Sequence, residues 1–151
     1  MLEIREESPR SDESRVLLAA SDAYAAALYP AESNHMVDVE VLAAPGTRFF
    51  VARIAGRAVG CGAVVAGAEE HAREIKRMFV GEAARGHGVG KALLHALEEA
   101  ARAAGAKALR LETGVAQPEA LGLYRRAGYC ERSPFGDYRE DPLSLYFEKA
   151  L

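Results

Sequence analysis

The chain has 151 residues and a mass of 16.2 kDa, and 19 Lys and Arg against 22 Asp and Glu give it a net charge of −3. This size and a hydrophobic content of 50% are typical of one folded domain, so we expect a single domain over residues 1–151. The acidic balance argues against a nucleic-acid partner, since binding phosphates requires a surplus of Lys and Arg. No apolar run approaches the roughly 18 residues of a membrane span, and the N-terminus lacks the features of a signal peptide. We therefore expect a cytoplasmic protein with no membrane partner.

The cysteines and histidines suggest neither a disulfide nor a metal site. Cys61 and Cys130 stand far apart in the sequence, which is typical of small buried thiols in a reducing compartment. The histidines show none of the spacings of zinc ligands, so we predict no metal. Cys61 lies between two glycines in a predicted strand, which favours close packing there over a nucleophilic role.

The N-terminal part of the chain predicts a strand and a long helix. Residues 2–5 alternate apolar and charged side chains, as a half-buried strand does. Ser11 and the acidic residues after it favour a helix that runs from there to Leu28, and Pro30 ends it. Residues 31–38 break the periodicity, so we expect a loop or a short helical connection there.

A hairpin and a third strand are predicted next. Residues 47–54 are rich in β-branched and aromatic side chains, and a turn at Gly56 leads to a second apolar run at 58–66. Residues 74–80 again alternate and predict another strand. The first half of the chain is therefore expected to form mostly antiparallel sheet.

The second half predicts alternating helices and strands. A helix after a glycine-rich turn has one apolar face, formed by Val89, Leu93, Leu97, Ala100 and Ala104. Gly105 is expected to end this helix. The last strand is expected to bury one face, that of Leu143, Leu145 and Phe147. The remaining predictions are strands at 107–112, 129–131 and 143–148 and a helix at 118–127. The order of elements predicts a mixed α/β (α+β) fold.

The strongest local signal is the sequence RGHGVGK, from Arg85 to Lys91, between a predicted strand and a predicted helix. Its glycines allow backbone conformations that expose N–H groups, and the helix that follows directs the positive end of its dipole at the turn. Arg85 and Lys91 add fixed positive charge. The segment therefore predicts a site for a phosphate or a pyrophosphate.

Two common phosphate-binding patterns do not fit this turn. The P-loop pattern requires Gly where Arg85 stands, and Ser or Thr where Ala92 stands. The dinucleotide pattern fails at its last glycine, where Lys91 stands, and it expects a βαβ unit rather than a preceding hairpin. A nucleotide-binding domain remains an alternative, and it predicts stabilisation by ATP or NAD.

A third pattern, R-x-x-G-x-G, matches at Arg85, Gly88 and Gly90. With its flanks, KRMFVGEAARGHGVGKALL, it resembles the acetyl-CoA-binding segment of the GNAT acetyltransferase superfamily. Downstream, LETGVAQPEALGLYRRAGY resembles the next strand and helix of that family, and the C-terminal segment resembles uncharacterised bacterial members. The resemblance covers roughly residues 49–129. It implies a central, mostly antiparallel twisted sheet of about six to seven strands flanked by about four helices.

The resemblance also implies acetyl-CoA as cosubstrate and a set of residues that hold it. The backbone of Met78, Phe79 and Val80 would pair with the pantetheine arm in the manner of an added strand. Arg85 would support the glycine turn or add charge, and Gln117 stands where the family often has an Asn that contacts the CoA chain. The turn residues that would hold the pyrophosphate are Gly86, His87, Gly88, Val89, Gly90 and Lys91.

Tyr124 stands at the position of the family's catalytic tyrosine, where the resemblance implies a general acid that protonates the departing CoA thiolate. An amine acceptor with a pKa of about 10.4 is almost fully protonated at pH 7, so a base or a water chain should assist. Glu112 matches a base position of some family members. Glu74 on the neighbouring strand and His35 on the acceptor side are the other candidates, and the sequence leaves the choice open.

The expected reaction is direct transfer of the acetyl group to an amine acceptor in a ternary complex, because no seryl or cysteinyl nucleophile is evident. A backbone N–H of Val80 or Phe79 would polarise the carbonyl. The acceptor could be a small molecule, an amino acid or a peptide. The alternative is a non-catalytic acyl-CoA-binding or regulatory module. A homodimer is the commonest expectation for the oligomeric state.

Overall fold

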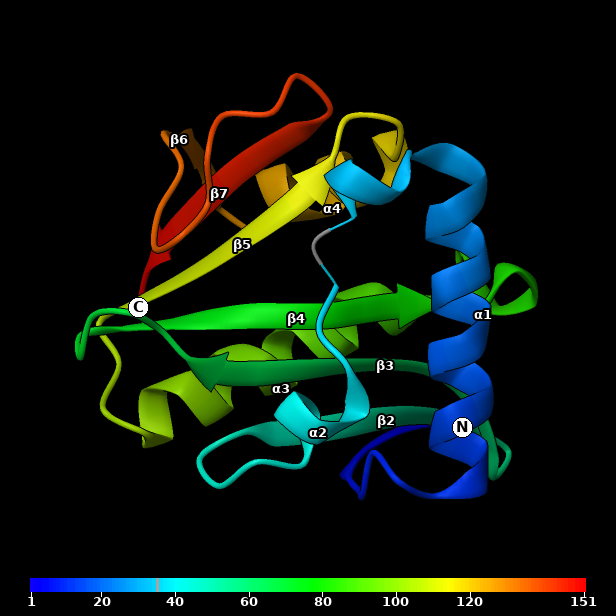
Figure 1. The fold of residues 1–151 in the computed structure, drawn as a ribbon. Coiled ribbons are helices and arrows are strands. Elements are labelled where there is room, and N and C mark those ends of the chain that lie inside the picture. Colours follow the sequence, from blue (N-terminus) through cyan, green and yellow to red (C-terminus); the bar gives the residue numbers. More distant parts are fainter. Residues whose placement is uncertain (35) are drawn as a thin grey trace.

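The computed structural model describes residues 1–34 and 36–151, so the acceptor-side candidate His35 lies outside the described residues. The described chain forms one sheet of seven strands in the order β1-β2-β3-β4-β5-β7-β6 (Figure 1). The strands are β1 (Leu2–Glu6), β2 (Arg48–Ile54), β3 (Arg57–Ala66), β4 (Ala72–Val80), β5 (Ala108–Gly114), β6 (Cys130–Arg132) and β7 (Ser144–Ala150). The α-helices are α1 (Asp12–Leu28), α2 (Val39–Leu42), α3 (Val89–Ala103) and α4 (Pro118–Arg126), and short 3₁₀ turns are η1 (Ala31–Ser33) and η2 (Glu82–Ala84).

Neighbouring strands are antiparallel except for β4 and β5, which run parallel. The predicted mixed α/β fold with a mostly antiparallel sheet is confirmed. The expected six to seven strands and about four helices are confirmed as well, since the described residues form seven strands and four α-helices.

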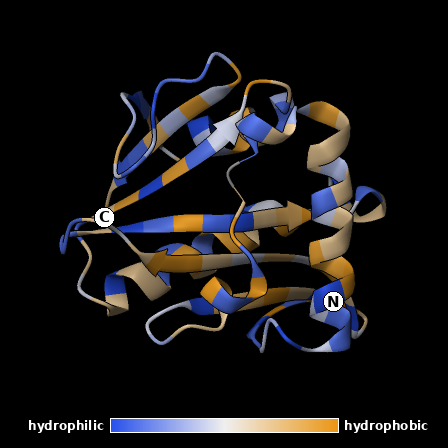
Figure 2. Ribbon diagram, viewed as in Figure 1, coloured by the Kyte–Doolittle hydropathy of each residue, from blue (hydrophilic) through white to orange (hydrophobic). Residues whose placement is uncertain are grey.

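Helices cover both faces of the sheet. α1 and α2 pack on one face, where Leu17, Leu18 and Leu42 contact alternate residues of β2 and β3. α3 and α4 pack on the other face, against the strand residues that alternate with the ones under α1 and α2. Because both faces are covered, Phe49, Phe50, Val51 and Ala52 of β2 are all buried. Figure 2 shows these apolar central strands beneath the helices.

The glycines beside Cys61 allow α3 to approach the sheet closely. A Cβ at Gly60 would lie 3.2 Å from Leu93, and a Cβ at Gly62 would lie 3.1 Å from Leu97. The thiol of Cys61 is fully buried on the opposite face, and burial raises its pKa to about 12. The sequence prediction of close packing is thus confirmed, and a thiol so protonated is a poor nucleophile.

The helix termini follow the predicted signals. The Ser11 side chain accepts a hydrogen bond from the N–H of Ser14 at 3.1 Å and caps α1, which ends before Pro30. Gly105 follows α3 with a φ of 83°, a conformation that favours glycine over residues with a Cβ. The residue types next to these helix ends were therefore enough to predict where the helices end.

Two features of β4 open the sheet. β4 pairs with β5 only from Ala72↔Ala108 to Glu74↔Arg110, and beyond that point the two strands diverge (Figure 1). The pairing of β4 with β3 shifts register next to Arg77, whose φ is 56°, so the strand carries a bulge there. The edge of β4 that faces β5 therefore has no strand partner beyond Glu74 among the described residues.

The structure corrects three details of the sequence prediction. Cys130, expected to be a buried thiol, is exposed. β7 buries both faces rather than one: Phe147 packs in the core, while Tyr146 contacts Phe135 and Tyr138 of the preceding segment, which folds over the other face. Ala104, predicted on the apolar face of α3, is exposed because it is the C-cap residue, where the helix leaves the sheet.

Candidate active site

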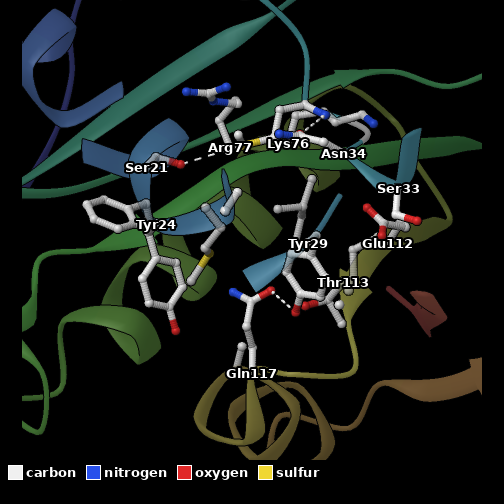
Figure 3. Close-up of a pocket in the computed structure, with 18 of the residues that line it drawn as sticks. Ser21, Tyr24, Tyr29, Ser33, Asn34, Lys76, Arg77, Glu112, Thr113 and Gln117 are labelled. Carbon is white, nitrogen blue, oxygen red and sulfur yellow. Dashed lines mark hydrogen bonds between the residues drawn. The ribbon is translucent and has the colours of Figure 1, made fainter. Parts of the chain in front are cut away.

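Two cavities meet where β4 and β5 diverge. A groove of about 1000 Å³ runs along β4, the glycine turn, α3 and α4. A pocket of about 130 Å³ lies on the other side, between α1, β4 and β5 (Figure 3). The residues that line both are Tyr24, Met78, Phe79, Gln117, Ala120 and Tyr124. A ligand in the groove can therefore reach a smaller molecule in the pocket at this junction.

The glycine turn opens α3 into the groove. Gly86 and Gly88 have φ values of 83° and 78°, which residues with a Cβ rarely adopt. Gly88 is the N-cap of α3 and no side chain caps this end, so the first N–H groups of the helix remain available. Gly90 serves packing, since a Cβ there would lie 3.0 Å from Leu123 of α4. This arrangement suits an anion.

Positive side chains surround the groove. Lys91 lines it beside the turn, and Arg126 of α4 and Lys149 of β7 line it further along. The Lys149 ammonium lies 3.1 Å from the carboxylate of Glu98, which also accepts a hydrogen bond from the Tyr129 hydroxyl at 2.8 Å. Because Glu98 offsets the charge of Lys149, Lys91 and Arg126 are the cations that favour a ligand with phosphate charges.

Arg85 supports the turn. Its Nε donates to the carbonyl of Val80 at 3.1 Å, and its guanidinium lies 4.8 Å from the centre of the Tyr24 ring. The side chain thereby joins the end of β4 to α1. These contacts agree with the supporting role that the sequence suggested, and the charged side chain of Arg85 also lines the groove.

The free edge of β4 borders the groove. The Phe79 carbonyl oxygen lies on the side of β3, 2.9 Å from the position of a Cβ at Gly60. Successive residues of a strand direct their N–H and C=O groups to opposite edges, so those of Val80 face away from β3. The Val80 carbonyl is bonded by Arg85, which leaves the Val80 N–H as a donor on this edge.

Tyr124 is buried at the junction of the two cavities. Burial raises its pKa above the usual value of a tyrosine, and the nearby carboxylate of Glu112 raises it further. The same carboxylate contributes to the raised pKa of Tyr29, Tyr138 and Tyr146. Glu112 is thus a negative charge within a group of tyrosines, and Tyr124 carries its proton at neutral pH.

The two candidate bases that the structure describes, Glu112 and Glu74, lie in different places. Glu112 lines the pocket and accepts a hydrogen bond from the Ser144 hydroxyl at 2.7 Å. The Glu74 carboxylate does not line either cavity and pairs with Lys76 at 3.0 Å and with the Tyr138 hydroxyl at 2.6 Å. His35 is outside the described residues.

The other predicted cosubstrate residues largely gather along the groove. Its lining includes Met78, Phe79, Val80, Arg85, Gly86, Gly88, Val89, Gly90, Lys91 and Gln117. His87 is exposed and does not line the groove.

Sequence reasoning missed the contribution of α1. Tyr24 and Tyr29 both line the pocket, and the Tyr29 hydroxyl donates to Gln117 Oε1 at 3.0 Å and accepts from the N–H of Ala116 at 3.1 Å. The only signal was two aromatic residues in an alanine-rich helix. The two hydrogen-bond partners of Tyr29 are 88 and 87 residues away in sequence.

Fold and site together define a class of protein. An open cationic groove with an uncapped helix N-terminus and a free strand edge suits an extended phosphorylated molecule, and the adjoining pocket suits a second, small one. Such a pair of cavities is typical of a group-transfer enzyme. None of the helices in the described residues is long and apolar enough to cross a membrane.

Comparison with known proteins identifies the family within that class. The model of the acetyltransferase (GNAT) family matches residues 12–129. An IAA acetyltransferase of Azospirillum brasilense is 51% identical over 148 residues, covering 98% of this chain and 97% of the relative. A crystal structure from Klebsiella pneumoniae, assigned as an acyl-CoA N-acyltransferase, is 38% identical with a TM-score of 0.84 and covers 100% of this chain and 98% of its own.

A more distant structure shares the fold with its ligand in place. The GNAT family acetyltransferase of Elizabethkingia anophelis with acetyl-CoA bound is 18% identical, with a TM-score of 0.71 and coverage of 99% and 98% of the two chains. The protein described here belongs to the GNAT acetyltransferase family and is an acetyl-CoA-dependent acyltransferase. The resemblance found in the sequence is confirmed.

Proposed function

We propose that the protein transfers the acetyl group of acetyl-CoA directly to an amine held in the pocket, through a ternary complex. The observation that carries this proposal is the junction of the two cavities, where Tyr124 and the free edge of β4 face the same space. The reactants would meet there without a covalent enzyme intermediate.

The groove fits acetyl-CoA, which supplies an activated thioester when bound. The N–H groups at the start of α3 and the side chain of Lys91 would hold the pyrophosphate. The edge of β4 at Met78–Val80 would pair with the amide groups of the pantetheine arm. These N–H groups and the cationic side chain together suit an extended polyanion that contains amide groups.

The chain's own groups supply polarisation and proton transfer. The Val80 N–H would donate to the thioester carbonyl oxygen, and a single such donor contributes up to a few kcal/mol to catalysis. Tyr124 would give its proton to the thiolate as it leaves. Burial keeps that proton in place at pH 7, while the raised pKa makes the phenol a weaker acid than the thiol. Its role is expected to be modest, because a thiolate with a pKa of about 8.5 is already a fair leaving group.

Glu112 is the proposed base for the acceptor. It lines the pocket, whereas Glu74 is held by Lys76 and Tyr138 outside it. A carboxylate at this place would favour a cationic amine on entry and would accept its proton directly or through a water. Removing the proton of an amine with a pKa near 10.4 costs roughly 4 kcal/mol at pH 7. The base must offset this free-energy cost.

The experiment that tests this function is a screen for acceptor-dependent release of CoA thiol. Wild-type protein is mixed with acetyl-CoA and small amines, amino acids, short peptides and IAA, the compound for which the Azospirillum relative is named. We expect thiol to be released only when an acceptor is present. Intact mass spectrometry should show that the enzyme itself stays unmodified. An acetylated enzyme, or binding without transfer to any acceptor, would contradict direct transfer.

A further inference from the structure

The C-terminal end of α1 is fastened to the turn between β5 and α4. Tyr29 is the C-cap residue of α1, and its hydroxyl accepts from the N–H of Ala116 at 3.1 Å and donates to Gln117 Oε1 at 3.0 Å. The ring lies so close to Gly114 that a Cβ there would be 1.9 Å from the hydroxyl oxygen. Gly114 is therefore required for this contact.

The hydrogen bonds have a fixed direction. A backbone N–H can only donate, so the Tyr29 oxygen accepts from Ala116 and the phenolic hydrogen points to Gln117. The atom of the Gln117 amide that receives it must be the oxygen, since the amide nitrogen has no free lone pair to accept. Figure 3 shows the amide nitrogen on the side away from Tyr29. The N–H donors of the amide are thus held away from Tyr29.

The position of Gln117 makes that orientation useful. Its side chain lines both cavities at their junction, and it makes no capping bond to α4 although it stands at the N-cap. Two N–H donors at the wall of the groove suit an amide carbonyl oxygen of an extended ligand. If the amide turned over, its oxygen would face that carbonyl and repel it.

We infer that Tyr29 is a positioning residue for the cosubstrate: it fixes the Gln117 amide so that its N–H groups meet a carbonyl of the bound CoA chain. This role rests on the proposed binding of acetyl-CoA along the groove. It links α1, which walls the pocket, to a contact in the groove. A single fixed hydrogen bond of this kind changes a dissociation constant about three- to tenfold.

Calorimetric titration of acetyl-CoA into four proteins tests the role of Tyr29. These are wild type, Tyr29→Phe, Gln117→Ala and the double variant. We expect Tyr29→Phe to raise Kd about three- to tenfold in the wild-type background and to add nothing when Gln117 is already Ala. An unchanged Kd for Tyr29→Phe, an equal rise in both backgrounds, or an unchanged Kd for Gln117→Ala would overturn the inference.

Two further variants separate positioning from stability. Gly114→Ala places a methyl group where the Tyr29 hydroxyl lies and is expected to raise Kd in the same way. Tyr146→Phe is the matched control, since it loses a bond of 2.7 Å from a buried phenol to the Arg139 carbonyl but lines neither cavity. It should lower Tm and leave Kd unchanged. Absence of acetyl-CoA binding to the wild type would instead overturn the proposed function.

Discussion

At Tyr124, burial and the carboxylate of Glu112 act in the same direction, because both favour the neutral phenol. A general acid must hold its proton before the leaving group departs, and the neutral phenol does so at pH 7. Phenylalanine would fill the same buried space without a proton to give. The function of this residue can therefore be tested with little disturbance of the packing.

Tyr124→Phe is expected to lower kcat about ten- to a thousandfold with little change in the Kd for acetyl-CoA. The wild-type rate should not fall through ionisation of this tyrosine below about pH 10, since its pKa lies above the usual value. Steady-state thiol release across a pH series measures both. Equal rates for the two proteins at every pH would remove Tyr124 from the chemistry.

Glu112→Gln should lower kcat/KM about a hundredfold or more at pH 7, because the amide cannot accept the proton of the acceptor. The glutamine keeps the size of the side chain and can still accept from Ser144. Glu74→Gln is the comparison, and its effect should be much smaller because Glu74 lies outside both cavities. A larger loss with Glu74→Gln would reverse the assignment of the base.

At the scale of elements, α3 and its glycine turn present a natural pair of variants. Gly88 and Gly105 flank the two ends of the helix, with φ values of 78° and 83°. In both places nothing lies within 4 Å of an added Cβ. Only Gly88 lines the groove. The two positions thus share their backbone strain and differ in their access to the ligand.

Gly88→Val and Gly105→Val are expected to lose similar stability, about 1–2 kcal/mol each, from a side chain in the left-handed region. Only Gly88→Val should abolish binding of acetyl-CoA, because its side chain would stand beside the N–H groups that face the groove. Denaturant unfolding and calorimetry give the two quantities. Retained affinity in Gly88→Val would show that the pyrophosphate is held elsewhere.

Local patterns predicted the elements well and their distant contacts poorly. The caps of α1 and α3, the hairpin of β2 and β3, and the glycine turn depend on neighbours in sequence, so the sequence revealed them. The bulge at Arg77 depends on the partner strand β3. The two buried faces of β7 depend on the loop that holds Phe135 and Tyr138. Neither relation leaves a periodic signal.

The same distinction applies to the site. The groove residues near β4 and α3 form one continuous segment whose pattern resembles a family, so most of them could be named in advance. The roles of Glu112, Tyr124 and Gln117 in chemistry remain predictions. Tyr29 could not be found, because its bonds to Ala116 and Gln117 exist only once α1 lies against the turn after β5.

At the scale of the whole molecule, buried tyrosines link stability to pH. Burial raises the pKa of Tyr124, Tyr129 and Tyr138 above that of an unfolded tyrosine, about 10. Their contribution is fully present below pH 10 and is lost as the pH rises toward the folded-state pKa. We therefore expect the free energy of unfolding, measured with urea, to fall above about pH 10. A flat profile there would contradict the burial of these phenols.

Acidic pH should destabilise the protein for the opposite reason. A hydrogen bond from Arg53 holds the pKa of Glu7 below its usual value. Burial alone would raise the pKa of Glu148, but the hydrogen bonds from Arg110 and Arg132 outweigh burial and lower it. A lowered carboxyl pKa stabilises the fold above the unfolded value of about 4.3, and that contribution is lost as the pH falls through the folded pKa. The same urea series should therefore show a decline below about pH 4.

The ligand preference of the groove tests most directly whether it is built for acetyl-CoA. Thermal unfolding of the wild type is followed with acetyl-CoA, CoA, ATP or NAD at equal concentration. At 100 times Kd a ligand adds about 2.7 kcal/mol, a rise in Tm of roughly 5–10 °C for a chain of this size. We expect such a rise with acetyl-CoA and CoA alone. An equal rise with ATP or NAD, or no rise with the CoA compounds, would contradict the account.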